Sequence, residues 1–220
     1  MDLFTFSYAL VNGVIIGGIY GGIALGLSLI FGVMRVINFA HGSFLMLAMY
    51  VAYMLWATFG LHPYASIIIS VPALFCVGFL VQQVIISPLF KRERAGVVEP
   101  TSALLLTAGV FLVIDNVVLM IFGPDVRSVN VDITYESILI GGLPVNLARL
   151  IAFAAAIIVA GGLAWWLKHS EMGRSIRATA QNRDAAALSG INVPLVYNVT
   201  FGIGCAVLGL FGALLLPFFS

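Results

Sequence analysis

The chain has 220 residues, of which 62% are hydrophobic and only 9% are charged. Soluble domains carry about 25% charged residues, so this composition is that of a membrane protein. The 10 Lys and Arg and the 9 Asp and Glu leave a net charge of +1. This balance argues against the clustered basic surface of a nucleic-acid-binding protein.

Six segments are long and apolar enough to cross a bilayer, which takes about 20 residues in a helix. They have no period-2 alternation, so we expect helices rather than barrel strands. The sequence thus predicts an all-α, polytopic transmembrane helical bundle that forms a single domain over residues 1–220. In chain order the spans cover about residues 8–32, 42–59, 64–87, 101–122, 147–167 and 196–218.

The basic residues indicate which ends of the spans face the cytoplasm. Most of them lie in the first, third and fifth connections, and they are Arg35, Lys91, Arg92, Arg94, Lys168, Arg174, Arg177 and Arg183. Only Arg127 and Arg149 lie in or beside the fourth connection, which also holds acidic residues. By the positive-inside rule the odd-numbered connections are cytoplasmic, and we expect the amino terminus outside.

The first span carries two sets of glycines at every fourth position. One set is Gly13, Gly17 and Gly21, and the other is Gly18, Gly22 and Gly26. Such small faces let helix backbones approach closely in a membrane. We expect both sets to serve helix packing, with pore lining as the alternative.

The stretch MRVINFAHGSF places polar groups between the first two spans, including Asn38, His41 and Ser43. In one interpretation it is a short cytoplasmic turn, in which Asn38 or Ser43 caps the next helix. In the other it belongs to a discontinuous helix whose polar groups line a watery cavity, with His41 as a gate or helix-end donor. The sequence alone leaves both open.

The fourth span contains an ionisable group, Asp115, followed by Asn116. A charge at the centre of a bilayer costs on the order of 2.5–3.5 kcal/mol, so such a residue is a functional candidate by default. The alternative is that Asp115 lies about 21 Å from the inner end of its helix and reaches the outer headgroups. We treat both residues as candidates for a pathway or gate.

The connection after the fourth span, residues 122–146, combines Gly, Pro and β-branched residues and is predicted to be an external loop with a short hairpin.

The connection at residues 168–195 instead has an amphipathic pattern, with apolar Ile176, Ala180, Ala187 and Leu188 among basic and polar neighbours. We expect one helix here that begins near Ser175 and stops at Gly190, because Gly is favoured just past a helix end. Such a helix lies on anionic lipid, docks a soluble partner or simply connects two spans.

Catalytic chemistry has little support in the sequence. It contains no Walker A run, no HExxH and no GxSxG, and its three histidines lie in three different connections or their edges. Cys76 and Cys205 stand alone in apolar segments, without the spacing of a metal site or disulfide framework. We therefore expect no metal and no cofactor, and regard an intramembrane enzyme as a weaker hypothesis than a transporter, a passive channel or a membrane scaffold.

Three segments together resemble the LivH-type permeases of branched-chain amino acid ABC importers: GIYGGIALGLSLIFGVMRVINFAHGSFLMLAMY, the FGPD after the fourth span, and GRSIRATAQNRDAAALSGIN. The resemblance covers essentially the whole chain. It implies a multi-pass protein of the bacterial inner membrane that is not itself an enzyme. It also implies a homologous LivM-type permease, two cytoplasmic ATPases and an extracytoplasmic amino-acid-binding protein as partners.

The same resemblance makes the 168–195 loop the element that couples the permease to the ATPases. Asp184, Ala185, Ala186 and Gly190 are similar to the EAA signature of importer permeases, with Asp in place of its Glu, while the Ile-x-Leu-Pro tail is missing. The chain also ends directly after its sixth span and so resembles a carboxy-terminally shortened form. The full set of implied coupling residues is Gly173, Arg174, Arg177, Ala178, Asn182, Asp184, Ala185, Ala186 and Gly190.

Overall fold

A computed structural model gives the fold, and it describes residues 3–88, 100–125, 127–129 and 131–218. Lys91, Arg92 and Arg94, on which the expected orientation partly rests, lie outside these residues. The long helices are α1 (Leu3–Met34), α2 (His41–Phe59), α3 (Ile67–Val81), α5 (Pro100–Phe122), α6 (Leu147–His169) and α9 (Val193–Leu215). A π-helical turn, η1 (Gln82–Ile86), continues α3.

Six helical segments, with α3 and η1 counted as one, have the length and apolar composition to cross a membrane, which confirms the predicted polytopic helical bundle. The largest difference from the predicted boundaries is at α1, which begins at Leu3 instead of residue 8. α3 begins at Ile67 because the chain makes a turn just before it, in which Ser66 donates its hydroxyl to the carbonyl of Pro63.

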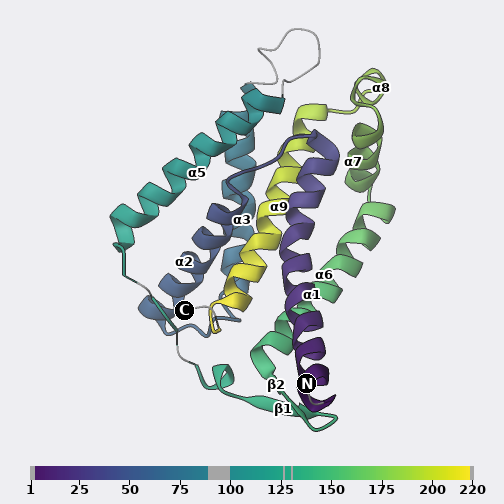
Figure 1. Cartoon of the computed structure of the whole chain (residues 1–220). Helices are drawn as coiled ribbons and strands as arrows, with labels where there is room; N and C mark the ends of the chain where they lie inside the picture. The colour runs from purple at the N-terminus through teal and green to yellow at the C-terminus, as the bar shows by residue number, and fades with distance from the viewer. Residues whose placement is uncertain (1–2, 89–99, 126, 130, 219–220) are drawn as a thin grey trace.

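The central element of the bundle is α9. Its most apolar window is 78% buried, against 11–28% for the other five spans. It contacts α1, α2 and α3, and Figure 1 shows it running between α1 and α3. The core around it includes Phe201, whose ring meets Phe44 of α2 edge to face at 5.9 Å. Glycines permit the close approach: a Cβ at Gly209 would lie 2.7 Å from the Ser70 carbonyl oxygen of α3.

In contrast, α5 lies at the margin of the bundle, where it contacts α2 and η1 (Figure 1). Its outer side is apolar and open, with Leu105 at 71% and Met120 at 83% exposure. In a membrane these side chains face lipid or a neighbouring subunit, because apolar surface is not driven inward there as it is in water.

The predicted hairpin is confirmed. After the 3-10 turn η2 (Asp132–Thr134), strands β1 (Ser137–Ile140) and β2 (Leu143–Asn146) pair antiparallel, with Ser137 opposite Asn146. Gly141 and Gly142 join them at φ values of 60° and 84°, the conformation that a two-residue hairpin turn demands. The hairpin lies at the same end of the bundle as the amino terminus (Figure 1).

At the opposite end, the 168–195 connection folds into two helices, α7 (Glu171–Gln181) and α8 (Arg183–Leu188) (Figure 1). The expected single helix from Ser175 is therefore wrong. The first helix begins earlier because Ser170 caps it, and the chain becomes extended at Asn182, with φ −152° and ψ 107°. The predicted stop holds: α8 ends just before Gly190, whose φ is 84°.

Candidate functional site

The connection between α1 and α2 is an extended segment packed into the bundle. Arg35 directly follows α1 and has a φ of 57°; it is the one residue other than Gly at positive φ among those described. Beyond it Val36, Asn38 and Ala40 are 0–5% exposed, whereas Ile37 and Phe39 are about half exposed. This alternation is that of an extended chain with one buried face.

His41 shows how deep this segment runs. Its Nε2 lies 3.1 Å from the carbonyl oxygen of Ile23, which fits a ring that carries its proton on Nε2 and donates it. Ile23 lies eleven residues before Met34, the last residue of α1, so this contact is roughly 16 Å below the end of α1. α2 thus begins within the bundle, and residues 35–40 lead from the end of α1 to that point (Figure 1). A simple turn at the end of the bundle does not describe this geometry.

The start of α2 is not capped as one interpretation proposed. Its N-cap residue is Ala40, and among the described residues the helix start has no side-chain capping hydrogen bond. Asn38 accepts instead from the Ala40 N–H, at 3.0 Å, just before the helix. The capping role for Ser43 is wrong because its hydroxyl points to another helix.

Two polar contacts tie this region to α5. The Ser43 hydroxyl donates to Asp115 Oδ1 over 2.6 Å, a short bond of the kind that carboxylates accept. Thr107, two turns earlier on α5, accepts from the Phe39 N–H at 3.3 Å and lies within donating distance of the Ile37 carbonyl. The structure therefore joins Ser43 and Asp115, with Asn38 and His41 in the adjoining segment. Asn116 does not join them, because it is exposed and donates to the Leu112 carbonyl of its own helix.

Sequence reasoning missed two buried polar residues, Thr107 and Gln82. Thr107 is 1% exposed and carries the second contact with α5. Gln82, in the π-helical turn, is fully buried, and neither atom of its side-chain amide has a partner among the described residues. Two consecutive glutamines in an apolar run could have pointed to Gln82, which lies in a π-turn, a feature that often marks functional positions. A single Thr within a span, such as Thr107, gives no comparable signal.

The two glycine sets of α1 meet different surroundings. In the first set, Gly13, Gly17 and Gly21 have open space where a Cβ would be. In the second, Gly18 adjoins Phe153, and Gly22 adjoins Phe211 and Ala156. A Cβ at Gly26 would lie 2.6 Å from the Gly204 carbonyl oxygen of α9. Within the described residues, only the second set has helices packed against it.

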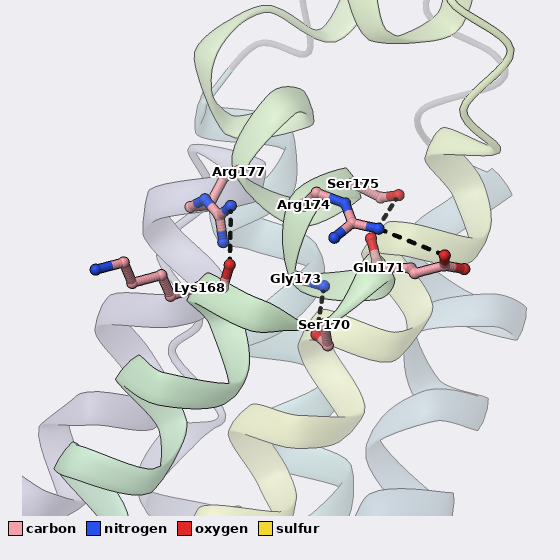
Figure 2. A network of polar contacts seen from close by, with 7 residues as sticks. All are labelled: Lys168, Ser170, Glu171, Gly173, Arg174, Ser175 and Arg177. Carbon is pink, nitrogen blue, oxygen red and sulfur yellow. Dashed lines mark hydrogen bonds and ion pairs between the residues drawn. The ribbon is translucent and has the colours of Figure 1, made fainter.

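The corner between α6 and α7 is built by Ser170 and Gly173 (Figure 2). Ser170 ends α6 and caps α7, accepting from the Gly173 N–H at 2.9 Å. A Cβ at Gly173 would collide with the Leu167 carbonyl, so the turn requires a glycine. Buried Ile176 and Thr179 hold α7 against the bundle, while Arg174 and Arg177 remain exposed.

Asn182 separates the two helices of this connection and starts the second. Its side-chain oxygen accepts from the N–H groups of Asp184 and Ala185, each at 3.0 Å. The Arg183 guanidinium lies over the Tyr197 ring of α9, 5.8 Å from its centre. These contacts fix α8 at the end of the bundle.

α8 presents a small apolar surface outward. Ala186 is buried, so it positions the helix and is not available for contact. Ala185, Ala187 and Leu188 are exposed, Leu188 at 91%. The amphipathic pattern suggested that Leu188 lies on the same buried face as Ile176. It does not, because the helix is interrupted at Asn182 and α8 runs separately from α7. Leu188 is thus a contact candidate that the implied coupling set lacked.

These features define a class: a polytopic helical membrane protein with a polar re-entrant segment inside the bundle and a two-helix connection exposed at one end. A family model described as the permease component of branched-chain amino acid transport systems matches residues 9–220. The chain belongs to this family, which confirms the resemblance noted from its motifs and makes it a permease component, not an enzyme.

Individual relatives agree over nearly the whole chain. The permease LivH of Salmonella typhimurium is 29% identical over 98% of this chain and 72% of its own length. LivH of Escherichia coli is 28% identical over the same shares, and BraD of Pseudomonas aeruginosa is 25% identical over 97% of this chain and 72% of its own. All three are named as high-affinity branched-chain amino acid transport system permease proteins. No solved structure matches the chain.

The family and the six helices also confirm the expected location, a multi-pass protein of the inner membrane. As one component of a transport system, the chain works with other subunits. No group of three or more His, Cys, Asp and Glu residues that could hold a metal ion occurs in the part of the chain that the structure describes.

Proposed function

We propose that this chain is the membrane permease subunit of an ATP-driven ABC importer for branched-chain or related amino acids. The family match over residues 9–220 is the observation that carries the proposal. Its partners would be a homologous LivM-type permease, two cytoplasmic ATPases and an extracytoplasmic amino-acid-binding protein. The chain would act as a single transmembrane domain that does no bond chemistry itself.

The exposed end of α8 is the proposed contact with the ATPases. Ala185, Ala187 and Leu188 offer an apolar surface, and Asp184 and Gly190 lie at its two ends. Gly173, Ala178, Asn182 and Ala186 would position the two helices instead of touching the partner. Arg174 lies on the outer side of α7, where an ATPase bound to the 168–195 loop reaches it.

The re-entrant segment is the proposed gate or pathway lining. Ser43 and Asp115 join α2 to α5, which otherwise has limited packing on the bundle. Movement of the cytoplasmic helices during the ATP cycle would reach α2 through the buried core of α1 and α9 and change this contact. Asn38 and His41 are candidates for the same gate. Asn116 is exposed and away from this segment, so it is a candidate only for a surface shared with another subunit.

Co-expression with two ATPases and a binding protein tests the whole proposal. We expect the ATPases to co-purify with the chain, and leucine-loaded binding protein to stimulate ATP hydrolysis in proteoliposomes together with leucine uptake. Leucine flux without ATP would identify a passive channel. Failure to bind any ATPase would favour a scaffold.

We also propose that the amino terminus and the hairpin face outward. The exposed residues Ser137 and Ser189 lie at opposite ends of the bundle, in the hairpin and just after α8. In a variant without the native cysteines, Ser137→Cys should react with an impermeant maleimide in intact cells. Ser189→Cys should react only after permeabilisation. The reverse pattern would invert the orientation.

A further inference from the structure

The corner between α6 and α7 gathers cations with unequal surroundings. Figure 2 shows Arg174 reaching toward Glu171, with which it forms an ion pair at 3.4 Å. On the other side of the corner lie Lys168 and Arg177, and the Arg177 guanidinium donates to the Lys168 carbonyl at 3.4 Å. This hydrogen bond holds the Arg177 guanidinium against the backbone of Lys168, while the Lys168 ammonium extends outward on its own flexible side chain (Figure 2). Neither forms an ion pair with any carboxylate of the described residues.

The two cations lie where a membrane-spanning helix ends. Lys168 is the penultimate residue of α6, whose apolar window is only 11% buried within this chain, so most of its surface is open to lipid or to a neighbouring subunit. Trp165, one turn earlier, is 65% exposed and stacks on His169 at 5.2 Å. Exposed Trp followed by Lys is the pattern of a helix at the boundary between hydrocarbon and headgroups.

We propose that Lys168 and Arg177 bind the phosphate of an anionic phospholipid headgroup, with Trp165 against the upper part of its acyl chains. A guanidinium and an ammonium together match a phosphodiester in charge and hydrogen bonding. We favour a lipid over a free phosphate because the exposed surface of α6 beside the two cations is apolar and includes Trp165. Only a lipid could cover that apolar surface as well as bind the cations. The site would fix the base of α7 at the membrane surface, independently of any bound ATPase.

Lipid retention tests this assignment without a transport assay. The purified full chain, in nanodiscs of phosphatidylcholine with phosphatidylglycerol, should retain phosphatidylglycerol preferentially after detergent extraction, as native mass spectrometry measures. One basic residue near an anionic surface changes affinity by about fivefold. Lys168→Gln and Arg177→Gln should each weaken retention by about that factor, and the double variant by roughly its square.

Arg174→Gln is the matched control, because it removes the same charge one turn away from a side chain already paired with Glu171. It should leave retention near the wild-type value. An equal loss in Arg174→Gln would replace the discrete site with a diffuse basic surface and overturn the proposal. The double variant Lys168→Arg, Arg177→Lys preserves both charges and should retain phosphatidylglycerol. If this variant is monodisperse but loses the lipid, the proposal is also contradicted.

Two further arms separate the alternatives. Millimolar inorganic phosphate should not displace the lipid, and displacement would identify a free-anion site. If Arg177→Gln lowers ATPase co-purification but leaves phosphatidylglycerol retention unchanged, the pair belongs to a protein interface and the lipid site is wrong.

Discussion

The Ser43 hydroxyl donates to the Asp115 carboxylate over 2.6 Å and thereby joins the first turn of α2 to the far half of α5. Polar bonds between membrane helices contribute roughly 0.5–2 kcal/mol. Ser43→Ala and Asp115→Ala each remove one partner of this bond and should each lower the unfolding midpoint in detergent. A double-mutant cycle should give a coupling of about 1 kcal/mol.

Asn116→Ala is the control for this pair, because Asn116 lies next to Asp115 but bonds only within its own helix. It should leave the stability of the isolated chain unchanged. If Ser43→Ala lowers uptake while Asn116→Ala does not, the contact belongs to the transport cycle. Additive effects of Ser43→Ala and Asp115→Ala would show that the two side chains do not interact in the membrane.

Gly26→Ala should destabilise the bundle by about 1–3 kcal/mol, the usual cost of overpacking a core. Its Cβ would lie 2.6 Å from the Gly204 carbonyl, a backbone atom that cannot rotate away. Gly17→Ala is the control, because open space surrounds that position in this chain and Ala favours helix. The thermal midpoint of each purified variant measures the difference, and equal midpoints would contradict the α1–α9 packing.

Gly190→Val should reduce ATPase co-purification. The φ of 84° at Gly190 is one that β-branched side chains avoid, so the chain after α8 must shift. Gly123→Val provides matched strain, because Gly123 has a φ of 76° but follows α5 at the other end of the bundle. An equal loss of ATPase in both variants would point to general instability instead of coupling.

Leu188→Asp should lower ATPase affinity by one to two orders of magnitude while leaving the stability of the isolated chain within about 0.5 kcal/mol. Leu188 is 91% exposed, so the chain itself gains nothing from its burial. Ser189→Asp adds the same charge next to it without removing the apolar side chain. Undiminished ATPase binding by Leu188→Asp would exclude the proposed contact surface.

Asn182→Ala should cost about 1 kcal/mol locally, because it removes the acceptor for two N–H groups at the start of α8. Hydrogen exchange should accelerate in residues 183–188 and stay unchanged in α7. Ser189→Ala is the comparison, since its hydroxyl only donates back to the Ala185 carbonyl at the other end of the same helix. Faster exchange throughout α7 and α8 would mean that the two helices form one unit.

The sequence alone determined the features that depend on local chemistry. Six spans followed from length and hydropathy, the hairpin from the Gly, Pro and β-branched residues of its loop, and the end of α8 from Gly190. The signature around Asp184 indicated the family. Each of these signals acts within a few turns of chain, so no knowledge of packing was needed.

Only the tertiary structure decided which apolar surfaces meet. The mean hydropathy of α5 is 2.4 and that of α9 is 1.9, yet α9 is central and α5 marginal, because lipid is as apolar as protein and does not sort them. The same ambiguity hid which glycine set of α1 packs against α9. The hydrogen bond between Ser43 and Asp115, which are 72 residues apart, could not be predicted from the sequence either. Such a bond between spans depends on their relative depth and rotation.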